Sequence, residues 1–412
     1  MAHRTGLSGC CIARGISMHT YRYATLRQRV LVLWCCVWAI GLSACATAPV
    51  STTAVPAPAQ ISVAEGMART DTTGYLRADE VREFAFPADH GPHPEYAVEW
   101  WYYTGNLTDA QGNDYGYQFT LFRTGLPRTD ASQGGSQWRS DAVYMAHLAL
   151  SDGARQRFVA RERFNRGALG LAGAQAAPFR VWLDDWSVTS PDAATTQMRI
   201  QAQDGDIALD VTLDATGPIV LQGDRGLSQK SAAKGNASYY YSLPRMATTG
   251  TLRIGDTDVA VSGTSWMDRE WSTSALGTDQ VGWDWFALHL DDGSDIMLYQ
   301  LRNRDGSTDP FSGGSVRNRD GTVTRLAASD IRWAPQGVWT SPHTGAPYPA
   351  AWDIELIPLG LSLTVTPLIA DQELQVTVRY WEGAVRVDAR RAGSSLSGTG
   401  YLEMTGYADM PR

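Results

Sequence analysis

The sequence predicts an all-β protein, and three observations support this fold class. Short apolar alternations separated by turn residues run from about Tyr75 to Met404, and a two-residue period with β-branched and aromatic side chains is typical of strands. Forty glycines and nineteen prolines are spread along the chain, and no stretch longer than about ten residues carries a helical stripe. Together these features favour an antiparallel sandwich or barrel.

Individual strands are predicted where the alternation is strict, as at Tyr115–Leu121, Ile207–Leu213, Leu361–Val365 and Leu374–Val378. Five Asp-Gly pairs are of the kind that closes hairpins, which predicts antiparallel neighbours. They begin at Asp152, Asp204, Asp292, Asp305 and Asp320. The β-region is longer than one ordinary barrel requires. Two β-domains are therefore expected, at residues 74–273 and 274–412, with the junction in the loop around Ser272–Gln280.

The amino terminus has the features of an export signal. Residues 1–44 contain five arginines and no acidic residue, and they end in an uncharged run from Val30 to Ala44. A positive segment, an apolar segment of about 15 residues and small residues at its end are typical of a signal peptide. A transmembrane anchor is the alternative, but the run is shorter than the roughly 20 residues that span a bilayer. Translation could begin at Met1 or at Met18.

The run ends in Leu42-Ser-Ala-Cys45, which resembles the lipobox of a bacterial lipoprotein. The resemblance implies that Cys45 is lipidated and becomes the first residue of the mature chain. Residues 45–73, rich in Ala, Pro and Thr, are then expected to be a flexible tether. The expected location is the bacterial cell envelope, on the periplasmic side of the outer membrane, with membrane attachment through the lipid.

Composition excludes several classes of function. All five cysteines lie at or before Cys45, so the mature body has no thiol for disulfides, metal binding or nucleophilic catalysis. The signal removes five of the 35 basic residues and none of the 43 acidic ones, which leaves a net charge near −13. This charge argues against nucleic acid as a partner. No P-loop, dinucleotide fingerprint or nucleophile elbow occurs, and no cofactor is expected.

An aromatic strand is predicted at residues 98–104, which read Val-Glu-Trp-Trp-Tyr-Tyr-Thr. Alternation places Glu99, Trp101 and Tyr103 on one face and the residues between them on the other. In a barrel, one such face would line the lumen, so these three are candidate ligand contacts. A strand packed between two layers is the alternative.

Two histidines precede this strand, in a Pro- and Gly-rich segment. His90 and His93 could bind a metal with Glu95 or Glu99, but their setting gives no rigid ligand spacing. No metal site is therefore expected, and a loop that caps a barrel mouth is the favoured role.

Three consecutive tyrosines at 239–241 again place phenols on both faces of a strand. A buried tyrosine hydroxyl usually finds a hydrogen-bond partner. Tyr240 is therefore a candidate for a polar point in a pocket, and ordinary core packing is the alternative.

The densest cluster lies at Gly263–Ser272 and Gly282–Phe286, where four of the fifteen tryptophans are interleaved with charges. In an extended chain, Trp266, Asp268 and Glu270 share a face. Two carboxyls between indoles should have pKa values pushed apart, so they could act as general acid and general base. The remaining candidates for the pocket wall are Trp271, Trp283, Asp284 and Trp285. A structural ion pair made by Arg269 with one of the carboxyls is the alternative.

Four segments, at His93–Leu107, Gly235–Arg245, Ser265–Ser272 and Gly282–Phe286, carry a resemblance to a known family. With them in this order, the chain resembles the secreted AttH-like proteins, relatives of carotenoid 1,2-hydratase (hydroxyneurosporene synthase). The resemblance implies two consecutive lipocalin-like β-barrels, which agrees with the strand pattern.

The resemblance also implies a reaction, because the carotenoid enzymes add water across a terminal isoprenoid double bond without a redox cofactor. Asp268 would be the acid, supported by Glu270, Trp266, Trp271, Trp283 and Asp284. The chain departs from those enzymes where they have histidine and it reads Trp266–Glu270, so its acid–base set differs. AttH-like proteins are also called secreted hydrolases.

Three functions follow from these patterns. The first is a lipid-anchored protein that binds an apolar or isoprenoid-like molecule or lipid in a Trp-rich pocket. The second is an enzyme that hydrates or hydrolyses such a ligand with Asp268 and Glu270. The third is an accessory lipoprotein that works beside an envelope transporter.

Overall fold

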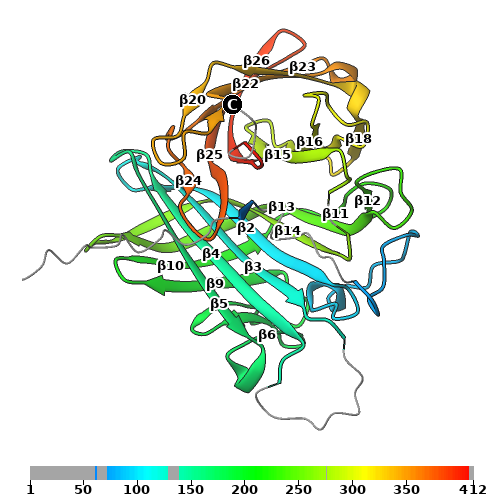
Figure 1. The fold of residues 1–412 in the computed structure, drawn as a ribbon. Helices are drawn as coiled ribbons and strands as arrows, with labels where there is room; N and C mark the ends of the chain where they lie inside the picture. The colour runs from blue at the N-terminus through cyan, green and yellow to red at the C-terminus, as the bar shows by residue number, and fades with distance from the viewer. Residues whose placement is uncertain (1–60, 63–71, 129–138, 275, 408–412) are drawn as a thin grey trace, which may run out of the picture. The chain divides into compact units, whose positions relative to one another are not determined.

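The computed structural model describes residues 61–62, 72–128, 139–274 and 276–407. They form an all-β fold with two large antiparallel sheets (Figure 1). The expected signal peptide, Cys45 and most of the expected tether lie outside the described residues. Within the described part, the helices are the short turns η1 (Ala88–His90), η2 (Ala168–Gly170), η3 (Ala328–Asp330) and η4 (Ile357–Leu359). None of them is long and apolar enough to cross a bilayer.

The first sheet has thirteen strands and forms a nearly closed barrel. In spatial order they are β5 (Arg157–Arg166), β4 (Ala142–Asp152), β3 (Asp114–Gly125), β2 (Val98–Asp109), β14 (Asp258–Ser272), β13 (Ala237–Ile254), β10 (Ile207–Ala215), β9 (Gln197–Asp204), β8 (Trp186–Thr189), β7 (Phe179–Leu183) and β6 (Ala172–Ala176), with β11 (Val220–Leu221) and β12 (Leu227–Gln229) beside β13.

The second sheet has eleven strands. In spatial order they are β18 (Val323–Ala327), β17 (Gly313–Arg317), β16 (Asp295–Asn303), β15 (Gln280–Leu290), β26 (Ser394–Met404), β25 (Val378–Arg391), β23 (Leu361–Pro367), β22 (Ala351–Leu356) and β19 (Ile331–Gln336), with β1 (Ile61–Ser62) and β24 (Glu373–Leu374) beside β25. A separate pair consists of β20 (Trp339–Thr340) and β21 (Pro347–Tyr348). The strand β1, inside the segment expected to be a tether, pairs in parallel with β25.

Strict alternation produces strands with one buried face. In β10, Ile207, Leu209, Val211 and Leu213 are buried, and the residues between them are half-buried. Burying one such side chain is worth about 1.5–3 kcal/mol relative to exposing it. A one-residue slip would expose the whole set, so the pattern fixes the register as well as the face.

The Asp-Gly pairs lie in the connections between antiparallel neighbours, as predicted: β4/β5, β9/β10, β15/β16, β16/β17 and β17/β18. Four of their glycines, at 205, 293, 306 and 321, have φ between 57° and 87°, which is the region that glycine enters without steric cost.

One predicted strand is wrong. Leu374–Val378 was expected to be continuous, but it divides into β24 and the start of β25, which pair with each other in antiparallel fashion. The chain reverses between them, and the backbone N–H of Thr377 donates to Glu162 Oε2 at 3.1 Å.

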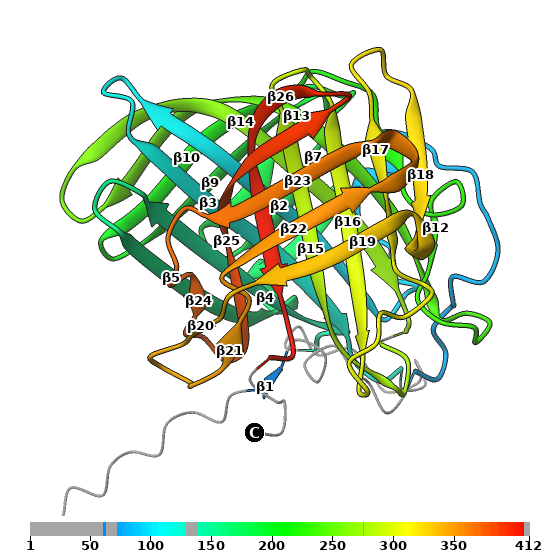
Figure 2. The ribbon, with the colours of Figure 1, turned by 90° about the horizontal axis from the view of Figure 1, so that it is seen from above.

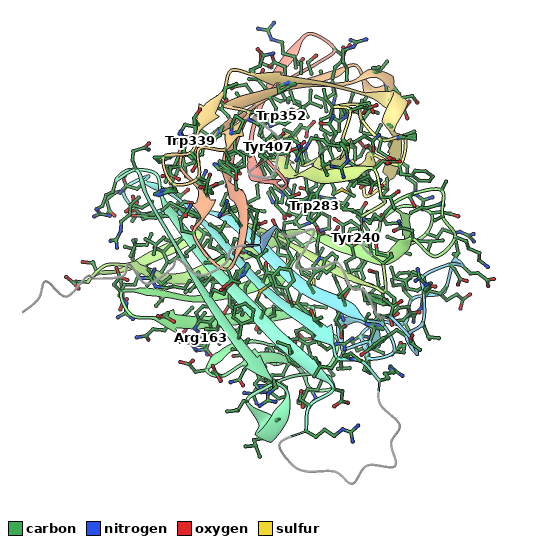
Figure 3. All side chains as sticks on the ribbon, viewed as in Figure 1. Arg163, Tyr240, Trp283, Trp339, Trp352 and Tyr407 are labelled. Atoms are coloured by element: carbon green, nitrogen blue, oxygen red, sulfur yellow. The ribbon has the colours of Figure 1, made fainter. Side chains whose placement is uncertain are left out.

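The two sheets pack against each other through β25 and β26, which contact β3 and β2, and through β16, which contacts β13. Figure 2 shows the second sheet lying across the first. The chain passes from one to the other between Ser272 and Gln280. Each sheet has its own core, and a third apolar cluster joins them. Tyr240 and Trp283 lie where the sheets meet, whereas Trp352 lies in the core of the second sheet (Figure 3).

Candidate functional site

A cavity of about 360 Å³ lies between the two sheets. Its walls come from β2, β3, β4, β13 and β14 on one side and from β15, β16, β25 and β26 on the other. Much of the lining is aromatic, including Trp100, Tyr102, Tyr240, Trp283, Trp285 and Tyr380. This volume suits a small organic ligand. The cavity is built on the outer faces of the sheets, because the inward face of each carries its own core.

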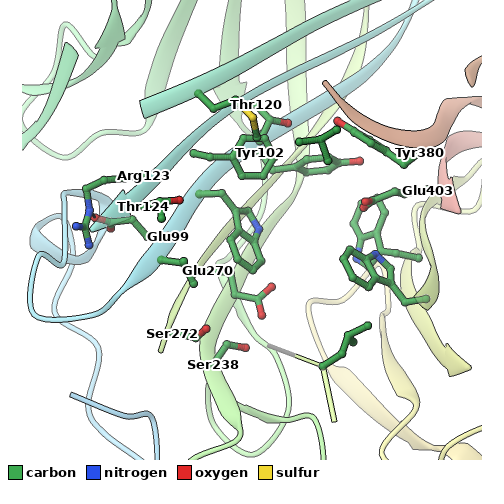
Figure 4. Close-up of a pocket in the computed structure, with 18 of the residues that line it drawn as sticks. Glu99, Tyr102, Thr120, Arg123, Thr124, Ser238, Glu270, Ser272, Tyr380 and Glu403 are labelled. Atoms are coloured by element: carbon green, nitrogen blue, oxygen red, sulfur yellow. Dashed lines mark hydrogen bonds and ion pairs between the residues drawn. The ribbon is translucent and has the colours of Figure 1, made fainter. Parts of the chain in front are cut away.

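The alternation of β14 decides which residues of the densest sequence cluster face this region. Trp266 packs in the cluster between the sheets, with Asp268 and Glu270 on the same face, whereas Arg269 and Trp271 lie inside the first barrel. Glu270 lines the cavity directly. Figure 4 shows Glu270 on one wall and Tyr380 with Glu403 on the other.

Asp268 lies one layer behind the cavity wall, where Tyr240 separates it from the cavity. Its carboxylate accepts hydrogen bonds from Tyr240 Oη at 2.6 Å, Ser242 Oγ at 2.5 Å and Trp266 Nε1 at 2.7 Å. Burial raises the pKa of Asp268 to about 7, although these three donors favour the ionised form. Asp268 therefore orients the Tyr240 phenol, which also accepts from Trp285 Nε1 at 3.1 Å.

Glu270 forms an ion pair with Lys230, whose Nζ lies 3.2 Å from Oε1. The Lys230 ammonium also faces the rings of Tyr240 and Tyr299, 5.6 and 5.2 Å from their centroids. Burial opposes its charge, but the Glu270 carboxylate keeps the pKa of Lys230 above its ordinary value. Sequence reasoning had considered Arg269 for this pairing and missed Lys230, although it is one of only two lysines in the chain.

Arg269 instead belongs to an ion cluster inside the first barrel. It and Arg123 both bind the carboxylate of Glu99, and the backbone N–H of His93 donates to the same group at 2.9 Å. Burial works against the Glu99 charge, yet Arg269 and its partners hold the pKa of Glu99 well below its ordinary value. Glu99 thus reaches one end of the cavity with its carboxylate already bound.

The remaining candidates of the first sheet lie away from the cavity. Trp101, Tyr103 and Trp271 are fully buried in the core of the first barrel. They share the inward face with Glu99, and the opposite face of β2 lines the cavity through Trp100 and Tyr102.

The histidine loop closes the interior of the first barrel. The His93 ring stacks on Trp271 at 3.7 Å between centroids, and His90 Nδ1 lies 2.6 Å from Tyr241 Oη. Trp101 Nε1 donates to the His90 carbonyl at 2.8 Å. No group of three or more His, Cys, Asp or Glu side chains among residues 61–62, 72–128, 139–274 and 276–407 is placed to hold a metal ion.

On β15, Trp283 and Trp285 line the cavity, whereas Asp284 is fully buried on the opposite face of the strand. The Asp284 carboxylate lies 3.0 Å from Arg302 Nε. Burial raises the pKa of Asp284 to about 6, although Arg302 opposes the shift. The strand β15 therefore contributes two indoles to the cavity wall, and the carboxyl of Asp284 lies on its opposite face.

Sequence reasoning missed two carboxyls of the second wall. Glu382 on β25 and Glu403 on β26 are direct partners in the strand register, and both line the cavity. Tyr102 donates to Glu382 Oε1 at 2.5 Å across the two sheets. The available signal was alternation, which puts Tyr380 with Glu382 and Tyr401 with Glu403 on the faces opposite Trp381 and Leu402, two residues of the second core.

Burial raises the pKa of Glu403 to about 8, and the nearby carboxyls of Glu270, Asp268 and Asp284 add to the shift while Trp283 opposes it. Burial and the neighbouring Glu403 likewise raise the pKa of Glu382 well above its ordinary value. The site thus combines aromatic faces, which suit an apolar ligand or a developing cation, with carboxyls that can hold protons at neutral pH.

Comparison with known proteins gives a consistent picture. Residues 77–407 match the model of a family described as AttH-like. A crystal structure of an AttH protein from Nitrosomonas europaea is 34% identical, covers 81% of this chain and 99% of its own, and superposes with a TM-score of 0.71. Kievitone hydratase from Nectria haematococca, 16% identical, shares the fold over 86% of this chain and 99% of its own, with a TM-score of 0.62.

Two curated relatives are similar in sequence over shorter regions. The dehydratase asqC of Emericella nidulans is 28% identical over 170 residues, which are 39% of this chain and 46% of the relative. Kievitone hydratase of Fusarium solani subsp. phaseoli is 24% identical over 218 residues, which are 51% and 60%. The matched region thus spans about half of the length of these two relatives.

Proposed function

Because the chain belongs to the AttH-like family, we propose that it adds water to, or removes water from, an apolar unsaturated small molecule bound between the two sheets. The observation that carries the proposal is a cavity with aromatic walls that also holds the buried carboxyl of Glu382 and the half-buried carboxyl of Glu403, both with raised pKa values. The sequence relatives named hydratase and dehydratase support the same class of reaction.

Each part of the site has a place in this chemistry. Reversible addition of water to an alkene needs a proton donor, an environment that tolerates a carbocation, and a group that takes a proton from water. The indoles of Trp100, Trp283 and Trp285 supply electron-rich faces for the cation. Carboxyls on both walls supply exchangeable protons.

Asp268 and Glu270, the acid and base expected from the sequence, enter the proposal in different ways. Glu270 lines the cavity and can contact a ligand, but its carboxylate is in an ion pair with Lys230. Asp268 acts through Tyr240, whose phenol is the nearer group to a ligand. We therefore treat Asp268 as a positioning residue.

Binding without turnover is the second candidate function. The Lys230–Glu270 ion pair favours it, because the Glu270 carboxylate is already engaged by an ammonium group and can still contact a ligand. Both candidates require the same ligand class, an apolar or isoprenoid-like molecule.

The test is incubation of the purified full-length chain with terminal isoprenoid alkenes, and with their tertiary alcohols, in ¹⁸O-labelled water. Hydration predicts products that gain one labelled water, and the reverse reaction predicts alcohols that lose theirs. Glu355→Gln, which alters a half-buried carboxyl of the second sheet outside the cavity lining, is the matched control. A ligand that co-purifies in native mass spectrometry and never changes mass would favour binding alone. Absence of both binding and turnover would refute the two candidates.

The envelope location is a separate proposal, supported by the lipobox-like sequence before Cys45. We propose that the lipid on Cys45 holds the protein at the periplasmic side of the outer membrane, where an envelope transporter is a candidate partner. Cys45→Ala should move the protein from the membrane fraction to the soluble fraction, and retention in the membrane would contradict the proposal.

A further inference from the structure

Glu382 and Glu403 are placed as a pair by the strand register. They are directly opposite on the antiparallel strands β25 and β26, where Cβ atoms are about 4.5–5.5 Å apart. Both carboxyls reach the same cavity. Like charges at such positions repel each other, so the arrangement needs a compensating group.

No basic side chain among the described residues forms an ion pair with either carboxyl. Two basic side chains line the cavity, and both have other partners: Lys230 pairs with Glu270, and Arg123 pairs with Glu99. Glu382 is 1% exposed, and the polar groups beside its carboxyl are the hydroxyls of Tyr102 and Tyr380, which carry no positive charge. A buried carboxylate in this state would be costly unless a proton neutralised it.

The other groups that face the pair reinforce this conclusion. They are Tyr102 from β2, Asp268 and Glu270 from β14, Asp284 from β15, and Tyr380 and Tyr401 on the strands of the pair itself. The nearby carboxyls oppose a further negative charge, and the three tyrosines are neutral at pH 7 because burial raises the pKa of each well above the ordinary value. The surroundings therefore favour a proton on the pair.

We propose that Glu382 and Glu403 hold one proton between them and act as the proton donor and acceptor of the cavity. The catalytic part of this assignment rests on the hydration or dehydration proposed above. The shared proton itself does not, because it follows from the geometry of the free protein.

The step can be written with its atoms balanced. The pair gives its proton to one alkene carbon, the π electrons form the new C–H bond, and the other carbon becomes a carbocation. A water oxygen then forms the C–O bond and releases a proton to the pair, which regains its starting state. Dehydration is the reverse, in which the protonated hydroxyl leaves as water and the pair takes a proton from the adjacent carbon.

A hydrogen-bonded chain connects the region of the pair with the edge of the first sheet. Tyr380 Oη lies 2.7 Å from His147 Nδ1, and His147 Nε2 lies 3.0 Å from Glu162 Oε1. The His147 side chain is fully buried, whereas that of Glu162 is 12% exposed. This chain gives the pair a route for exchanging protons with solvent.

Infrared difference spectroscopy of the full-length protein labelled with ¹³C at the Glu side-chain carboxyls tests the shared proton without any substrate. Because only the Glu bands shift on labelling, the signals of Asp268 and Asp284 cancel in the difference between the labelled and unlabelled spectra. The wild type should show a protonated-carboxyl band at pH 7 that Glu382→Gln and Glu403→Gln each shift in frequency, that the double variant removes and that Glu355→Gln retains. A spectrum with only ionised Glu at pH 7 would overturn the proposal.

Activity tests the catalytic part. With a substrate that the wild type turns over, Glu382→Gln and Glu403→Gln should each lower kcat at least about 100-fold, with ligand binding kept within about threefold. Folding of each variant is checked by circular dichroism, and Glu403→Asp, which keeps the carboxyl, should recover part of the rate. Variants that keep wild-type kcat would overturn the catalytic role. A wild type without turnover would refute the proposed function, and the infrared result would still decide on the proton.

Discussion

The hydroxyl of Tyr102 on the first sheet donates a hydrogen bond of 2.5 Å to Oε1 of Glu382 on the second sheet. This bond joins residues 280 positions apart in the chain and spans the two walls of the cavity. It stabilises the ionised form of Glu382, which burial disfavours. The contact therefore links the packing of the two sheets to the protonation of the site.

Replacing Tyr102 with Phe should raise the pKa of Glu382 further and lower the free energy of unfolding by about 1–2 kcal/mol, because a hydrogen bond to a charge-bearing group is lost. Urea denaturation measures the stability, and the labelled-Glu infrared band measures the pKa. Tyr401→Phe is the control, because the buried Tyr401 hydroxyl forms no hydrogen bond with Glu382 or Glu403 in the described part of the chain. Equal effects of the two substitutions would contradict the importance of the bond.

Asp268→Asn should reduce the pH dependence of stability. The pKa of Asp268 is raised to about 7 in the folded protein, against roughly 3.9 in an unfolded chain. The folded state binds the extra proton between these values, so this group lowers the free energy of unfolding by about 1.4 kcal/mol per pH unit as pH rises through that window. Urea denaturation at pH 5 and pH 8 should show a smaller loss in the variant. An unchanged loss would contradict the shift, and Asp388→Asn, at an exposed position, serves as control.

Lys230→Met should destabilise the protein by on the order of 3 kcal/mol, because it leaves Glu270 as an uncompensated carboxylate in a largely buried site. Adding Glu270→Leu should restore most of the lost stability, since the charge is then absent. A double-mutant cycle measured by urea denaturation gives the coupling between the two residues. Additive losses would show that the ion pair contributes little.

Arg269→Met should cost about 3–5 kcal/mol, because the ion cluster around Glu99 is fully buried. The same substitution at Arg199, which pairs at the surface with the half-buried Asp210, should cost less than about 1 kcal/mol. Thermal and urea denaturation measure both. Similar losses for the two arginines would contradict the central place of the Glu99 cluster in the first barrel.

Local patterns predicted much of this fold because they depend on neighbours in the chain. Alternation in Ile207–Leu213 fixed a strand and its buried face, and Gly205 marked the hairpin before it. The same rule correctly placed Asp268 and Glu270 on one face of β14 and Arg269 on the other. The prediction of one continuous strand at Leu374–Val378 failed because a chain that reverses its direction can carry the same short alternation as a straight strand.

The candidate site could not be predicted in full from alternation, because alternation does not show which residues of distant strands and loops meet. Glu382 meets Glu403 through strand register, and Lys230 meets Glu270 across a separation of 40 residues. Alternation gives β2 two aromatic faces without saying which one meets the core. Packing decided that Trp101 fills the first barrel and Trp100 lines the cavity. Long-range partners of this kind follow from the tertiary fold alone.

The alternation of β2, β14 and β15 has a consequence for how ligand preference can change. Most cavity-lining positions on these strands are flanked by positions that face a core. Variation confined to such positions, for example Trp100 and Trp283, would reshape the cavity while leaving the cores inside the two sheets intact. A directed-evolution library that spares Tyr102, whose hydrogen bond joins the sheets, would sample new ligand preferences, and natural divergence can follow the same route.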